Sequence, residues 1–128
     1  APGGDPGRAQ SLPPSGTIVP ALTPHPSDLV SQRGYGMAPF YESGLDDELR
    51  RMGVKTVITT GVSLNIAITG TTIEAVNRGY NVVLPVDCAA SDPPEYAEWL
   101  IRYTLRNMAV LTTAEGVATA WEVPWTGN

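Results

Sequence analysis

The sequence is short of several kinds of residue, and each shortage excludes a class of protein. It has one cysteine and one histidine in 128 residues, so it forms no internal disulfide and offers little for a metal centre. It carries 8 basic residues against 13 acidic ones, a net charge of −5, which provides no basic surface for nucleic acid. Its apolar runs are strand-sized, far below the roughly 20 residues that span a bilayer. We therefore expect no metal, no cofactor, no nucleic-acid partner and no membrane segment, and a reducing compartment such as the cytoplasm.

Proline, by contrast, is concentrated in the first third of the chain. Eight of the twelve prolines lie in the first 39 residues, and proline neither continues a helix nor donates to a sheet ladder. We predict a flexible segment over residues 1–15 and one domain over residues 16–128, whose first part, residues 16–40, is a surface loop. Because the chain opens with Ala1 and no initiator Met, we also expect a processed chain or a piece of a longer protein.

From residue 43 onward, helical and extended patterns alternate. Residues 43–53 place acids in the first turn, arginines in the last turn and a glycine just past the end, which is typical of a short helix. The same reasoning predicts helices over 64–78, 92–108 and 114–121, and β-branched or apolar strands over 54–61, 80–86 and 109–113. Buried strands joined by helices indicate the α/β class, here a three-layer α/β/α, Rossmann-like domain with a mainly parallel sheet.

The stretch TTGVSLNIAIT, residues 59–69, forms a predicted strand-to-helix turn at the carboxyl end of the sheet, where ligands bind in such folds. Unpaired backbone N–H groups and the helix dipole can hold an oxyanion or a carboxylate there. A nucleophile would stand at position 67, which is Ala67. Ser63 lacks a base, since the one histidine, His25, lies in the proline-rich part. We interpret Ser63 as a turn residue and Asn65 as a helix cap or ligand contact.

The segment LRRMGVKTVITTGVSLNIAITGTTIEAVNRGYNVVLPVDCAAS, residues 49–91, resembles the isochorismatase-like cysteine hydrolases. Its most specific part is TGVSLN followed by EAVNRGYNVVLPVD, and the likeness extends over about residues 16–120. The resemblance implies a parallel sheet, a cis peptide between Val62 and Ser63, and a catalytic Asp, Lys and Cys. It covers the C-terminal two-thirds of that fold, so we expect the first two strands to be missing from this chain.

The resemblance also assigns the catalytic positions residue by residue. The Cys position is occupied by Ala67 and the Lys position by Gln32, while the Asp belongs to the first strand, which we expect outside this chain. Whether the protein is an enzyme therefore stays open. The implied pocket is lined by these residues: Tyr35, Phe40, Val62, Ser63 and Asn65.

Three hypotheses follow. In the first, the domain has lost or altered its cysteine-hydrolase chemistry and is a pseudoenzyme that binds a small carboxylate or amide-like molecule, or acts as a structural or regulatory subunit. In the second, it cleaves amides or vinyl ethers through Cys88 or a bound water, although Asp87 beside Cys88 would raise the pKa of that thiol. In the third, Ala67 is an engineered substitution that traps a substrate.

Partners follow from the incomplete fold. Four strands without the first two would expose an apolar edge and face. We therefore expect a homo-oligomer, or a second chain or segment that completes the sheet, besides the small-molecule ligand. Trp99, Trp121 and Trp125 have no basic neighbours, and we interpret them as helix packing and a docked C-terminus rather than a stacking platform.

Overall fold

The computed structural model describes residues 18–31 and 36–122. It divides into two compact units, residues 1–34 and 35–128. The predicted boundary after residue 15 lies outside the described residues and stays a prediction. In the first unit, residues 18–31 contain a single short 3-10 helix, η1 (Pro20–Leu22), and no strand, as expected where prolines interrupt both kinds of hydrogen-bond ladder.

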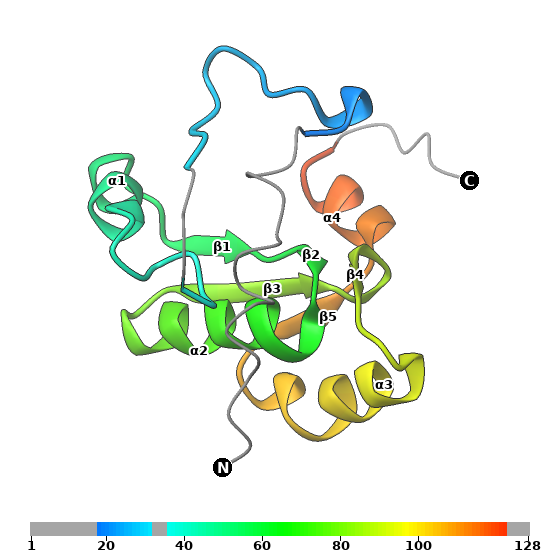
Figure 1. The fold of residues 1–128 in the computed structure, drawn as a ribbon. Helices are drawn as coiled ribbons and strands as arrows, with labels where there is room; N and C mark the ends of the chain where they lie inside the picture. Colours follow the sequence, from blue (N-terminus) through cyan, green and yellow to red (C-terminus); the bar gives the residue numbers. More distant parts are fainter. Residues whose placement is uncertain (1–17, 32–35, 123–128) are drawn as a thin grey trace, which may run out of the picture. The chain divides into compact units, whose positions relative to one another are not determined.

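The second unit alternates helices and strands, as Figure 1 shows. Every helix and strand predicted from residue 43 onward is present, each shorter than predicted. Within the described ranges, no helix combines the length and the apolar character needed to cross a membrane. The elements of this unit are α1 (Leu45–Arg51), β1 (Thr56–Ile58), β2 (Gly61–Val62), η2 (Leu64–Ile68), α2 (Thr69–Asn77), β3 (Asn81–Pro85), η3 (Val86–Cys88), β4 (Ala89–Ala90), α3 (Pro94–Tyr103), η4 (Leu105–Asn107), β5 (Val110–Thr112) and α4 (Ala114–Ala120).

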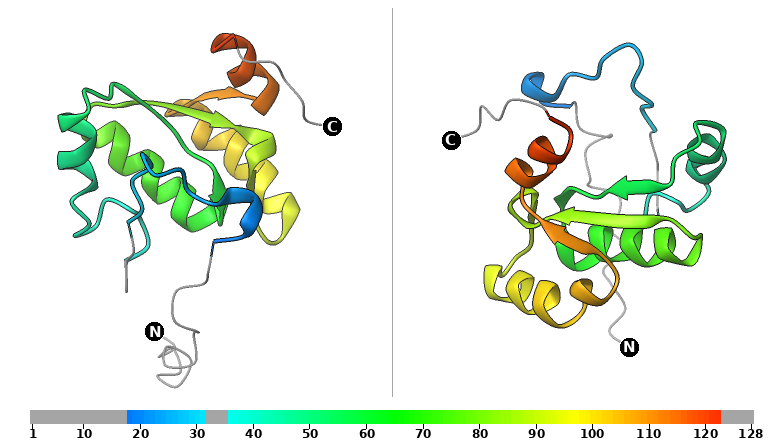
Figure 2. Two further views of the ribbon diagram at one scale, coloured as in Figure 1. Left: turned by 90° about the horizontal axis from the view of Figure 1, so that it is seen from above. Right: turned by 180° about the vertical axis from the view of Figure 1, so that it is seen from behind.

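Two parallel sheets organise this unit. The larger has the order β1-β3-β5, and the smaller pairs β2 with β4. Because crossovers between parallel strands are right-handed, α2 and α3 are expected on the same side of the larger sheet. Figures 1 and 2 show them there, with α4 on the other side. The predicted α/β, Rossmann-like architecture with a mainly parallel sheet is confirmed.

The core forms two apolar clusters against the α2 and α3 side of the sheet. Side chains two positions apart on a strand point to the same face, so Val82 and Leu84 of β3 both face this side. Val82 belongs to one cluster and Leu84 to the other. The first cluster contains Phe40, Ala75, Tyr80 and Val82. The second contains Leu64, Ile68, Leu84 and Leu105. The second cluster lies beneath the start of η2 and therefore fixes the turn that precedes it.

The opposite face of the sheet is apolar and only partly covered. Val83 of β3 is in register with Ile58 of β1 and Val110 of β5. Ile58 and Val83 are half-buried, whereas 65% of Val110 is exposed. Among the described residues β1 pairs with β3 alone. An apolar stripe therefore crosses three strands on this face, next to an edge strand with a free side.

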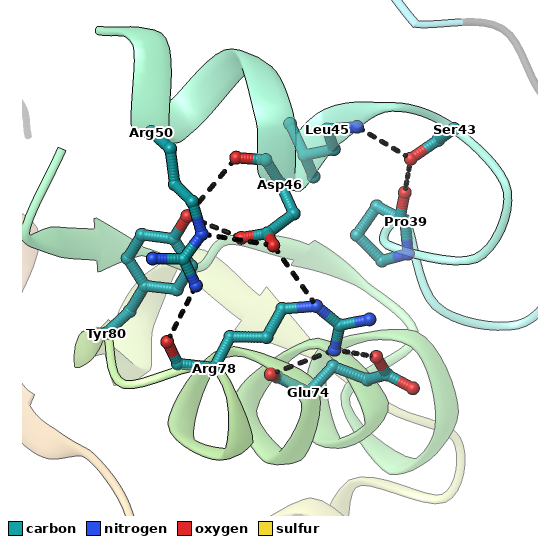
Figure 3. A network of polar contacts seen from close by, with 8 residues as sticks. All are labelled: Pro39, Ser43, Leu45, Asp46, Arg50, Glu74, Arg78 and Tyr80. Carbon is teal, nitrogen blue, oxygen red and sulfur yellow. Dashed lines mark hydrogen bonds and ion pairs between the residues drawn. The ribbon is translucent and has the colours of Figure 1, made fainter. Parts of the chain in front are cut away.

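A polar network fastens α1 to the rest of the unit (Figure 3). The Ser43 hydroxyl accepts the Leu45 N–H at 3.2 Å, and the residue at the N-cap position of α1 is Gly44, with φ 71°. Arg50 donates to Asp46 on the same helix at 3.2 Å and to the carbonyl of Arg78 at 3.0 Å. The first contacts fix the start of α1, and the last ties its end to the end of α2.

Two predicted helices differ from the structure. The helix predicted over 64–78 begins as a π-helix, η2, before it becomes α2. The helix predicted over 92–108 ends at Tyr103, because Thr104 leaves helical geometry at φ −120° and the Asn107 amide donates to the Tyr103 carbonyl at 3.2 Å. Because of this break, the Leu105 side chain points into the second core cluster, where it is fully buried.

The interpretation of Trp99 and Trp121 as packed side chains was wrong. They are 60% and 65% exposed. Helical spacing allots the inward face of α3 to smaller or aliphatic residues, Ala97, Leu100 and Ile101, which pack on the second cluster, and this leaves Trp99 on the other face. Trp125 lies outside the described residues.

Candidate functional site

The strand-to-helix turn is built on the two-stranded sheet. Gly61 and Val62 are in parallel register with Ala89 and Ala90. Gly61 has φ 116°, a conformation that side chains with a Cβ rarely adopt. The peptide between Val62 and Ser63 is cis, as the family resemblance implied. The chain leaves the two-stranded sheet after Val62 and enters η2 at Leu64.

The start of η2 is held by hydrogen bonds that differ from those of a regular α-helix. The Ser63 carbonyl accepts from the N–H groups of Ile66, at 3.3 Å, and Ile68, at 3.1 Å. The Thr69 hydroxyl donates to the Leu64 carbonyl at 2.6 Å. Single π turns of this kind are frequent at functional sites. Helix geometry leaves the first N–H groups, those of Leu64 and Asn65, without intrahelical acceptors at the positive end of the dipole.

The predicted turn residues lie together at this end of the sheet. Val62 is 76% exposed, while Ser63, Asn65 and Ala67 are half-buried. Leu64 and Ile68 point into the second core cluster. Ala67 offers only a methyl group, and its carbonyl accepts from the Thr71 hydroxyl at 2.6 Å. The arrangement can bind a negative charge through backbone N–H groups, and position 67 itself supplies no nucleophile.

Phe40 was predicted to line the pocket, and the structure places it in the core instead. Its side chain is 6% exposed and belongs to the first cluster, apart from Leu64 and Ile68 in the second. The ring centre lies 6.2 Å from that of Tyr80, and the Arg78 guanidinium lies 4.8 Å from it. Burial of this aromatic ring therefore contributes to the core. Gln32 and Tyr35 lie outside the described residues.

Asp87 and Cys88 follow β3 at the same edge of the sheet. Burial, first, and then the neighbouring Asp87 carboxylate raise the pKa of the Cys88 thiol, so the thiol is mostly protonated at neutral pH and is a poor nucleophile. Asp87 has another task, which the sequence did not reveal: its Oδ1 accepts the Ala114 N–H at 2.8 Å. The helix predicted from residue 114 was the signal that could have suggested this contact, because the N–H groups at a helix start attract carboxylates.

His25 takes part in a local turn. Its backbone N–H donates to Asp28 Oδ2 at 2.8 Å, and its ring Nδ1 lies 2.8 Å from the Ser27 hydroxyl. Over residues 18–31 and 36–122, no three His, Cys, Asp or Glu side chains gather as metal ligands would. These contacts account for His25 as a residue that orders its own loop.

Two buried hydroxyls near the turn were also missed. Thr59 is 6% exposed, and its hydroxyl, like that of Ser91, has no hydrogen-bond partner among the described residues. Thr59 precedes β2, and Ser91 follows β4. Buried hydroxyls normally find a partner in protein, water or ligand. In the sequence, the two threonines of TTG, residues 59–61, were a signal for the buried Thr59 hydroxyl.

The comparisons with known proteins agree with this geometry. A model of the isochorismatase domain matches residues 2–116. Ureidoacrylate amidohydrolase RutB from Methylorubrum extorquens is 33% identical over 86 residues, or 66% of this chain and 34% of that protein. The chain thus spans about a third of the length of the curated relatives it matches.

Solved structures lead to the same family. An isochorismatase family protein from Burkholderia thailandensis is similar with a TM-score of 0.79 at 27% identity, covering 88% of this chain and 63% of that one. An isochorismatase-like hydrolase from Alkaliphilus metalliredigens gives a TM-score of 0.77, also at 27% identity, covering 82% and 57%. Together with the domain match over most of the sequence, these likenesses bear out the resemblance drawn from residues 49–91: the chain belongs to the isochorismatase family.

Proposed function

We propose that this protein is an isochorismatase-family hydrolase fold that has lost or altered its cysteine chemistry and keeps a pocket for a small carboxylate or amide-like molecule. The observation that carries the proposal is Ala67. It stands one residue before the end of η2, where the family resemblance puts the nucleophilic Cys, and a methyl group cannot attack a carbonyl. Gln32 at the Lys position supports the same conclusion, since a neutral amide does not shuttle protons at neutral pH.

The chemical class of the ligand follows from the turn. The unpaired N–H groups at the start of η2 favour a carboxylate or a polarised carbonyl oxygen. Ser63 and Asn65 are half-buried beside them and offer a hydroxyl and an amide, and the buried hydroxyls of Thr59 and Ser91 can accept or donate further hydrogen bonds. A relative named as an amidohydrolase, RutB, acts on an amide, which supports an amide-like ligand here as well.

The experiment uses benzoate and benzamide as probes of the pocket, followed by the backbone amide NMR signals of the chain. We expect saturable shifts of the Leu64, Asn65 and Ala67 signals and no hydrolysis of benzamide. Ala67→Leu should abolish the shifts by filling the site, whereas Ala120→Leu, on the exposed side of α4, should leave them unchanged. Absence of any probe-dependent shift at these residues would contradict a retained pocket.

Turnover separates the proposal from an active hydrolase. The chain should not cleave a panel of amides and vinyl ethers. Cleavage that Cys88→Ala abolishes would establish Cys88 as a non-standard nucleophile, and cleavage that survives this change would point to a bound water. Activity gained in the double variant Ala67→Cys, Gln32→Lys, in a protein that also holds the family Asp, would show that only the reactive groups are missing.

A structural or regulatory subunit remains a second role for the same fold, and the apolar stripe formed by Ile58, Val83 and Val110 favours it. A second chain, or a further segment that completes the sheet, would cover this stripe and pair with the free side of β1. Its test is whether Val110→Asp lowers the apparent mass of the assembled protein. The proposal places the protein in a reducing compartment such as the cytoplasm, in keeping with its single cysteine, Cys88.

A further inference from the structure

The outward face of α3 is aromatic and exposed. Tyr96, Trp99 and Tyr103 are 48%, 60% and 56% exposed, and their spacing of three and four residues places them on one side of the helix. The rings of Trp99 and Tyr103 lie 5.4 Å apart between centres. With Glu98 and Arg102 they line a shallow groove of about 160 Å³. So much aromatic surface on one helix is characteristic of an interface core.

The charged residues beside this groove are arranged with opposite signs about one point. Glu98 lies two positions before Leu100, and Arg102 lies two positions after it. Tyr96 and Tyr103 also lie on either side of Leu100, four positions before it and three after it. Helical spacing places Glu98 and Arg102 on one flank of Trp99 and the two tyrosines on the other flank. Leu100 itself points inward, to the second core cluster.

A two-fold axis requires this kind of pattern. When two copies of one helix pack antiparallel about a two-fold axis, residue i of one copy meets residue j of the other, and j meets i. With the axis level with Leu100, Glu98 of each copy lies opposite Arg102 of the other, and Tyr96 opposite Tyr103. Trp99 of both copies lies near the centre. A parallel pairing about an axis along the helices would instead set the charged flank of each copy against the tyrosine flank of the other, so neither Glu98 nor Arg102 would meet an opposite charge.

We propose that α3 is a self-association surface, through which two copies of this chain pair antiparallel about a two-fold axis near Leu100, with Trp99 at the centre. The occupant is a second copy because the face is complementary to itself in charge and in ring position. Arg102 is exposed, and its guanidinium lies on the same face of the helix, over the Tyr103 ring at 5.4 Å from the centre. The proposal is independent of ligand binding or catalysis at Ala67.

The test is sedimentation equilibrium of the full chain over a concentration series. The wild-type chain should form dimers, and Trp99→Ala should raise the dimer dissociation constant by at least about a hundredfold, because a central tryptophan is lost on both sides. Glu98→Arg and Arg102→Glu should each raise it by about tenfold or more, since each change opposes like charges twice. Trp121→Ala and Lys55→Glu, at exposed positions away from α3, should leave it unchanged.

Two complementation experiments follow from the antiparallel register. The double variant Glu98→Arg, Arg102→Glu should regain wild-type association, because both pairs are reversed together. A mixture of the two single variants should form heterodimers more readily than either variant alone. A chain that is monomeric throughout, dimers indifferent to Trp99→Ala, or single charge variants that the double variant fails to rescue would each overturn the proposal. Circular dichroism of every variant confirms that α3 still folds.

Discussion

The Tyr80 hydroxyl donates a hydrogen bond to Oδ1 of Asp46, at 2.6 Å, between residues 34 positions apart in the sequence. The bond joins α1 to the residue that precedes β3 (Figure 3). The Arg50 guanidinium pairs with Asp46 at 3.2 Å and lies 5.3 Å from the centre of the Tyr80 ring. One carboxylate therefore organises both a helix cation and a buried aromatic ring.

This hydrogen bond makes the stability of the unit depend on pH at both ends of the scale. It is the main cause of a lowered pKa of Asp46 and of a raised pKa of Tyr80. The Asp46 contribution is present above the carboxyl's usual pKa of 3.8 and is lost as pH falls through the lowered value. The Tyr80 contribution is present below the phenol's usual pKa of 10.0 and is lost as pH rises through the raised value.

We expect Tyr80→Phe to lower the thermal midpoint at neutral pH and to flatten its fall in acid and in alkali. The measurement is the midpoint over a pH series. Asp47→Asn is the matched control, because it removes an acid from the same turn of α1 and leaves the Tyr80 bond in place. A Tyr80→Phe profile parallel to the wild type would mean that the bond contributes nothing to the pH dependence.

Leu105 should be among the most sensitive core positions. It is fully buried and packs with Leu64 and Leu84 in the second cluster. Leu105→Ala should lower the free energy of unfolding by about 2–5 kcal/mol, since it removes apolar contacts and leaves a cavity. Urea unfolding measures the loss. Met52→Ala, at a position 60% exposed, should change it by less than about 0.5 kcal/mol, and equal effects would argue against the assigned core.

Thr113 caps α4, where its hydroxyl accepts the Gly116 N–H at 3.1 Å. Thr113→Ala should cost about 0.5–2 kcal/mol of stability, because that N–H loses its partner. Thr113→Ser keeps a hydroxyl at the same place and should recover most of the loss. Urea unfolding of both variants measures the loss of stability. Identical losses would show that the methyl group of Thr113, rather than its hydroxyl, stabilises the start of α4.

Cys88 should react slowly with a thiol reagent in the folded chain. Its pKa is raised from the usual 9.0 by burial and then by Asp87, so less thiolate is present at neutral pH than for a free cysteine. We expect alkylation by iodoacetamide to be slower at neutral pH than in the urea-unfolded chain, and its rate to climb as pH increases beyond the ordinary thiol range. Rapid labelling of the folded chain at neutral pH would instead favour Cys88 as a nucleophile.

Much of the fold followed from local patterns. Residues 43–53 carry their own helix signals, and β-branched residues mark the strands around Val57 and Val82, so the order of helices and strands could be predicted without tertiary information. The turn at Gly61 also followed, because a glycine stands where the backbone requires a positive φ. The family followed from the resemblance of residues 49–91, which the domain match confirms. The family resemblance assigns Ala67 to the nucleophile position, and this assignment stays a prediction.

What the sequence could not decide depends on which long-range partner each side chain meets. Phe40 was predicted for a pocket and packs with Tyr80 in the core, because ring burial next to a residue 40 positions further along the chain is invisible to local periodicity. Trp99 was predicted to pack inward and faces outward, because helical spacing defines two faces and only the packing of Leu100 and Ile101 selects the inner one. The sequence by itself determined the order of elements; the tertiary structure decided which side chains are core, turn or open surface, because burial is set by the sheet and not by neighbours in the chain.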